Sequence, residues 1–164
     1  MAEPIIERIV EEIAARIDEI TAAAGFHYDL EAVRPTRHEI VSVAEGAYVA
    51  PKDGTTMVIQ DDPELAEGEE LAGSPAKLEW ILPVHLMIFA IESDDSRIPI
   101  DRRLNRMRSD VEKKLREDPT RGGLAVDTRI RSPYEFPQSA QQTGVVCVVN
   151  IHFRTSEDDP YAQG

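Results

Sequence analysis

The stretch Gly144-Val145-Val146-Cys147-Val148-Val149-Asn150-Ile151-His152-Phe153-Arg154 is the strongest strand signal in the sequence. Most of the residues after the glycine are apolar and β-branched, a composition that fits a pleated, buried surface. We therefore expect residues 145–153 to form a strand in the middle of a sheet. Alternation gives one of its faces Val145, Cys147, Val149, Ile151 and Phe153.

A second core strand is predicted at residues 77–91. One of its faces is uninterruptedly apolar, and the other, which includes His85, is mostly apolar too. The first face carries Leu82, Val84, Leu86, Ile88 and Ala90. A strand that is apolar on both sides is covered twice, or is covered once and contacts a neighbouring subunit.

Two amphipathic helices are predicted, at residues 4–24 and 98–117, because apolar side chains recur there at intervals of three and four. Pro4 and Pro99 suit the first turn of each helix, and Gly25 and Asp118-Pro119 mark the stops. The apolar stripes are Ile5, Ile6, Ile9, Ile13, Ile17 and Ile20 in the first helix, and Ile100, Leu104, Met107, Val111 and Leu115 in the second.

The remaining segments give weaker signals. Strands are expected at residues 26–33, at 55–60 after an Asp53-Gly54 turn, and at 124–131, with a second strand or an extended arm at 39–49. Residues 61–75 are predicted to be an acidic surface loop and 132–143 a polar loop. This order favours an α+β fold, a largely antiparallel sheet with two main helices packed on one face.

Length and composition indicate a single globular domain at residues 1–154 followed by an acidic tail at 155–164. The net charge of −13 argues against non-specific binding to nucleic acid or anionic lipid. Cys147 lies among valines and is interpreted as a small buried hydrophobe. The sequence shows no signal peptide and no apolar run that could span a membrane, so we expect a cytosolic protein.

No pattern in the sequence predicts catalysis. A glycine-rich phosphate loop, a nucleophile elbow and a Cys-x-x-Cys motif are all missing. The histidines, His27, His38, His85 and His152, are far apart in sequence. His85 and His152 fall on the two strongest strands and could meet on one face, but no spacing supports zinc. We expect no enzyme activity, no cofactor and no metal.

Charge is distributed unevenly along the chain. Residues 97–117 hold eight basic and four acidic residues, a net charge of +4, which leaves −17 for the rest of a chain whose total is −13. A basic helix on an acidic body can pair with the acidic surface of an identical neighbour. The alternative is a solvated helix with local pairs such as Asp110–Lys114. A nucleic-acid face is disfavoured, because aromatic residues are not interleaved with the basic ones.

The carboxyl-terminal sequence Phe153-Arg154-Thr155-Ser156-Glu157-Asp158-Asp159-Pro160-Tyr161, after an apolar strand, resembles that of tail terminator proteins of long-tailed bacteriophages. Further features resemble this family over most of the chain. They are the amphipathic first helix, Val33-Arg34-Pro35, the strand end Val58-Ile59-Gln60-Asp61-Asp62, the strand with Trp80, the helix at 101–115 and Gly122-Gly123-Leu124-Ala125.

The resemblance implies a structural assembly protein and not an enzyme. Such proteins form a hexameric ring that caps the tail tube, stops its polymerisation and joins the tail to the head connector. The implied partners are other copies of the chain, the tail tube protein and a head connector or head completion protein, and DNA passes through the ring without specific binding. The implied location is the tail–head junction of the virion, after assembly in the host cytoplasm.

On this basis, contacts with other subunits or partners are assigned to basic residues and to the tail. They are Arg34, Arg37, Arg102, Arg103, Arg106, Arg154, Asp158, Asp159 and Tyr161. The competing class is a small acidic binding module, either a tail-assembly chaperone or an inhibitor of a host DNA-binding protein, which would stay a monomer or dimer. An enzyme with a pocket built from distant residues is the third possibility.

Deleting residues 156–164 is expected to leave folding intact and to impair ring formation or binding to tail tubes, because an acidic tail outside the core is suited to a partner. Circular dichroism melting would check folding, and sedimentation with tubes would check assembly. A truncated chain that assembles normally on tubes would refute this role.

Overall fold

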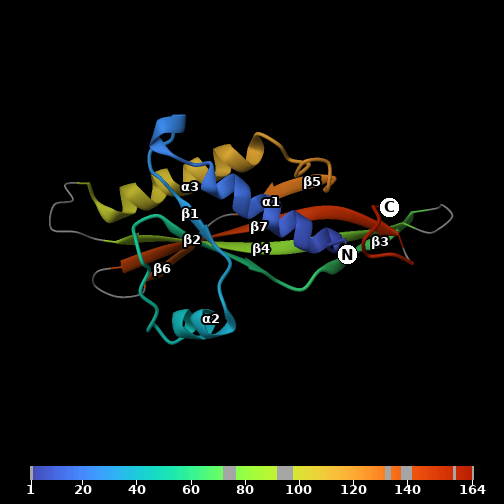
Figure 1. The fold of residues 1–164 in the computed structure, drawn as a ribbon, viewed down its shortest axis with the longest axis horizontal. Helices are drawn as coiled ribbons and strands as arrows, with labels where there is room; N and C mark the ends of the chain where they lie inside the picture. The colour runs from blue at the N-terminus through green and yellow to red at the C-terminus, as the bar shows by residue number, and fades with distance from the viewer. Residues whose placement is uncertain are drawn as a thin grey trace.

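The computed structural model describes residues 2–71, 77–91, 98–131, 134–137, 142–156 and 158–163. They form an α+β fold whose sheet is mixed and mostly antiparallel, which is the fold class predicted from the sequence. Helices α1 (Ile5–Asp18) and α3 (Ile100–Arg116) lie together on one face of this sheet, also as predicted (Figure 1).

Strands β4 (Lys77–Ile91) and β7 (Gln142–Ser156) form the centre of the sheet. They pair antiparallel along their whole length, from Lys77 opposite Ser156 to Ile91 opposite Gln142, without a shift in register. Strands β2 (Thr55–Gln60) and β3 (Glu64–Leu71) follow one another along the other side of β4. Strands β5 (Asp127–Ile130) and β6 (Tyr134–Pro137) pair antiparallel with β7, one after the other, on its side away from β4. Strand β1 (Glu31–Val33) pairs parallel with β2.

Each face of the central pair buries its own set of side chains, as the alternation in the sequence predicts. The first face packs against α1 and α3 through residues such as Leu86, Val149 and Ile151. On the second face, Met87, Phe89 and Val146 pack against Val43 of a further helix, α2 (Arg37–Ala44). Figure 1 shows α2 on the side of the sheet opposite α1 and α3. It covers only part of that face.

Helix α2 corrects the expectation of a strand or arm at residues 39–49. The sequence Thr36-Arg37-His38-Glu39 is a capping-box pattern. The Thr36 hydroxyl accepts a hydrogen bond from the Glu39 N–H at 3.3 Å and satisfies one of the free N–H groups of the first turn. This local signal outweighs the weak alternation that suggested a strand.

The expected acidic loop at 61–75 is also wrong, since β3 occupies Glu64–Leu71. An edge strand needs backbone partners on one side only, and β4 supplies them despite the many carboxylates. The polar loop at 132–143 is wrong in part, because it contains β6 and the first residues of β7. Residues 72–75, 132–133 and 138–141 lie outside the described residues.

Two predicted strands and one helix are shorter than expected. The strand at 26–33 is reduced to β1, because the N–H groups of His27 and Tyr28 donate to the buried Asp110 carboxylate instead of to a sheet partner. The strand at 124–131 begins only at Asp127. The helix at 4–24 ends at Asp18, and a separate 3-10 turn follows at Ala22–Ala24.

The Asp53-Gly54 turn before β2 is formed as predicted. Gly54 has a φ of +84°, and a Cβ at this position would lie 2.4 Å from the Asp29 carbonyl oxygen. Its N–H donates to the Phe89 carbonyl at 2.9 Å, and its own carbonyl accepts from Glu31. Only glycine allows this close approach, which ties β1 and the end of β4 to the start of β2.

Arg121 connects the turn after α3 to α1. Its side chain is completely buried, and its guanidinium donates to the carbonyl oxygens of Leu115 and Asp118 and pairs with Glu12 at 3.3 Å. The two carbonyls belong to the end of α3 and the turn after it, where backbone acceptors have no partner within the helix. Arg121 thus supplies the donors that this end of α3 needs.

Replacing Arg121 with Met is expected to destabilise the fold by about 3 kcal/mol, since buried carbonyl groups lose their donor. The control is Arg129→Met, whose side chain is 68% exposed and should cost less than about 1 kcal/mol. Urea denaturation gives both free energies of unfolding. Equal stability of the two variants would contradict this role of Arg121.

Candidate functional site

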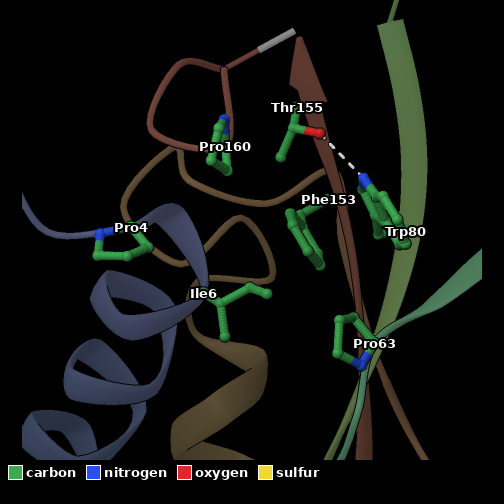
Figure 2. Close-up of a pocket in the computed structure, with 7 residues that line it drawn as sticks. All are labelled: Pro4, Ile6, Pro63, Trp80, Phe153, Thr155 and Pro160. Atoms are coloured by element: carbon green, nitrogen blue, oxygen red, sulfur yellow. Dashed lines mark hydrogen bonds between the residues drawn. The ribbon is translucent and has the colours of Figure 1, made fainter. Parts of the chain in front are cut away.

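An apolar pocket with a volume of about 150 Å³ lies where the two chain termini meet the end of the sheet (Figure 2). The start of α1 forms one wall, and β4 and β7 form the wall opposite. The segment after β7 closes the top of the view in Figure 2. The lining residues are Pro4, Ile6, Pro63, Trp80, Phe153, Thr155 and Pro160.

Hydrogen bonds fix the walls of this pocket. The Trp80 indole N–H donates to the Thr155 hydroxyl at 2.9 Å, so the one polar side chain in the lining already has a partner. The Ile5 N–H donates to the Pro160 carbonyl at 3.4 Å, and the Ser156 N–H donates to the Ala162 carbonyl at 3.2 Å. These bonds fold the segment after β7 back onto the start of α1.

Acidic residues flank several of the pocket-lining residues in the sequence. Each lining proline has an acidic neighbour in sequence, because Glu3 precedes Pro4, Asp62 precedes Pro63 and Asp159 precedes Pro160. Glu3, Asp62, Asp158 and Asp159 are all exposed. An apolar floor with a rim of negative charge suits an apolar group flanked by cations.

A second, polar depression of about 310 Å³ lies on the part of the sheet beyond α2. It is lined by Asp61, Glu64, Ile81, Pro83, His85, Arg131, Val148 and Asn150. The His85 Nε2 atom lies 3.7 Å from an Asp61 carboxylate oxygen, too far for a hydrogen bond. The lining includes no serine, threonine, cysteine or lysine that this pair could activate as a nucleophile.

His85 and His152 share this face of the sheet but do not meet. His85 is opposite Val148 and His152 is opposite Ile81, an offset of four residues, or roughly 13 Å along the strands. His152 instead lies 4.0 Å from Glu79. Within the described part of the chain, no three His, Cys, Asp or Glu residues are close enough together to hold a metal ion.

Cys147 is buried, as predicted, with 1% of its surface exposed. Burial raises the pKa of its thiol to about 12, so the reactive thiolate form is suppressed at neutral pH.

The basic residues assigned to contacts lie in different places. Arg102 is exposed on α3 and Arg106 is half-buried one turn further on. Arg37 is exposed at the first position of α2. Arg34 pairs with Glu7 through two oxygens, at 2.8 and 3.4 Å, and its hydrogen bond lowers the pKa of that carboxyl.

Arg103 exposes little surface that a partner could contact. Its side chain is 7% exposed and donates to the Ile91 carbonyl at 2.9 Å and to the Asp53 carboxylate. It also lies over the Tyr28 ring, 5.9 Å from the centroid. These contacts tie α3 to the turn before β2 and to the end of β4.

The tail residues are ordered against the chain itself. Asp158, Asp159 and Tyr161 are exposed in a turn that packs on the start of α1, and Asp159 accepts a hydrogen bond from the Tyr161 N–H at 2.9 Å. Arg154 lies nearby in β7 and pairs with Glu79 at 3.5 Å. Strand β7 continues to Ser156, two residues beyond the boundary expected between domain and tail.

The local pair expected between Asp110 and Lys114 is not formed. Asp110 is buried and binds the His27 ring at 2.8 Å, and Lys114 pairs with Glu19 of the α1 end and with Glu117, both at 2.9 Å. Lys114 is thus paired with the end of α1. Arg102 and Arg106 make no ion pair with any described residue.

No family model matches this chain, and no curated protein matches it either. Among the helices that the structure describes, none is long and apolar enough to cross a bilayer.

Proposed function

We propose that this chain is a tail terminator, a structural protein that forms a ring on the phage tail tube, stops tube polymerisation and joins the tail to the head connector. The observation that carries the proposal is the segregation of charge. Helix α3 presents Arg102, Arg106 and Lys113 along one outward stripe, while exposed acidic residues adjoin the apolar pocket at the other end of the fold.

Such a distribution favours contact between copies over contact with nucleic acid. Opposite charges on different surfaces of one molecule give a head-to-tail interface, which closes into a ring when the rotation between copies allows it. The large net negative charge outside α3 keeps phosphate groups at a distance. DNA could therefore pass through such a ring without being held.

The two depressions described above are consistent with an assembly role. The apolar pocket has no titratable side chain in its lining, and the polar depression has a histidine and carboxylates without a nucleophile beside them. Both are open surfaces next to exposed charges, which is the composition of a docking surface with a polar rim.

The purified protein is expected to form rings of defined size as its concentration rises. Light scattering after size exclusion, at several concentrations and at low salt, gives the mass, and negative-stain imaging shows the rings. A closed ring has one limiting mass, whereas an open filament grows without limit. Raising the salt should shift the equilibrium toward monomers.

The same measurement distinguishes a tail terminator from the competing class of protein. A protein that stays a monomer or dimer at every concentration, and also on purified tail tubes, would contradict the proposal and favour a small acidic binding module. Rings that bind tube ends and halt elongation would support it.

A further inference from the structure

We propose that the first turns of α3 of one copy dock over the apolar pocket of the next, with Arg102 and Arg106 against its carboxylate rim. The inference rests on the proposed ring, because it names the contact that joins neighbouring copies. The occupant of the pocket is thus a second copy of this chain.

The pocket provides the acceptor surface. Trp80 is half-buried there, and Leu65, its cross-strand partner on the same face of the sheet, is 53% exposed. The start of α1 forms one wall here but leaves Trp80 and Leu65 partly exposed, so apolar surface remains in contact with water. Covering it stabilises a complex in proportion to the apolar area that is buried.

The carboxylates beside the pocket favour a partner surface with positive charge. Asp62, Asp158 and Asp159 are exposed beside the lining residues Pro63 and Pro160. Their side chains form no ion pair with a described residue, so their charges are not neutralised within the chain. Carboxylates at the edge of an apolar surface favour a partner that carries Arg or Lys around an apolar side chain.

Helix α3 offers that combination. Arg102 and Arg106 are four residues apart and therefore share a face of the helix, away from the buried stripe that includes Leu104 and Met107. Just before the helix, Ile98 is 37% exposed. An exposed apolar side chain at the start of a helix that carries two arginines on one face matches an apolar pocket with acidic neighbours.

The two surfaces lie at opposite ends of the molecule. In Figure 1, α3 begins at the left end of the long axis, while β3 and both chain termini lie toward the right. A contact between opposite ends cannot be satisfied within one copy, and it leaves each new copy with a free surface at either end. This is a heterologous interface, the type that builds rings.

Charge reversal tests the contact. Arg102→Glu with Arg106→Glu, and separately Asp62→Arg with Asp158→Arg, should each weaken self-association at least about 100-fold, because like charges would face each other. Combining all four substitutions in one chain restores opposite charges and should restore assembly. The control is Arg116→Glu, an exposed arginine at the opposite end of α3 from the proposed contact, which should leave assembly unchanged.

Trp80 reports directly on the pocket, because it is the only tryptophan in the chain. Its emission should shift as wild-type copies associate, and also in the four-substitution variant. It should stay constant over the same concentrations in each charge-reversed pair. Circular dichroism melting of every variant shows that the fold is retained.

Three results would overturn the inference. Rings that persist in both charge-reversed pairs would place the contact elsewhere and leave the proposed ring intact. Loss of rings with Arg116→Glu alone would move the contact away from the first turns of α3. A wild-type protein that never self-associates would contradict both the proposed ring and this contact.

Discussion

The pairing of β4 with β7 is the constraint on which the rest of the structure depends. Its register, unbroken from Lys77 opposite Ser156 to Ile91 opposite Gln142, decides which side chains face α1 and α3 and which face α2. A slip of one residue would exchange the two faces. The same register also places Trp80 beside Phe153 in the apolar pocket.

The sequence predicted best those elements whose signal is local. Strands at 55–60 and 77–91 were predicted to the residue, because their side chains alternate and are buried on both sides. Helix α2 was missed although Thr36-Arg37-His38-Glu39 is a capping-box pattern, and β3 was missed because an edge strand can be acidic. Arg103 lies four residues before the buried Met107, and this spacing could have shown that it faces inward.

The candidate site was harder to predict, because its walls come from segments far apart in the chain. Pro4, Pro63, Trp80 and Pro160 have no shared pattern in sequence beyond the acidic neighbours of the prolines. The tail also gave no sign that it would fold back on α1, since its composition is polar. Only the tertiary fold brings both chain termini and β3 toward one end of the molecule and the start of α3 to the other (Figure 1).

The central claim is that copies of this chain join end to end. A short bismaleimide cross-linker tests it most directly on a chain with Arg102→Cys and Asp158→Cys, because the native Cys147 is buried and unreactive. The account predicts a ladder of cross-linked species that ends at a closed ring, and monomers only when either substitution is omitted. Monomers only in the doubly substituted chain would contradict it.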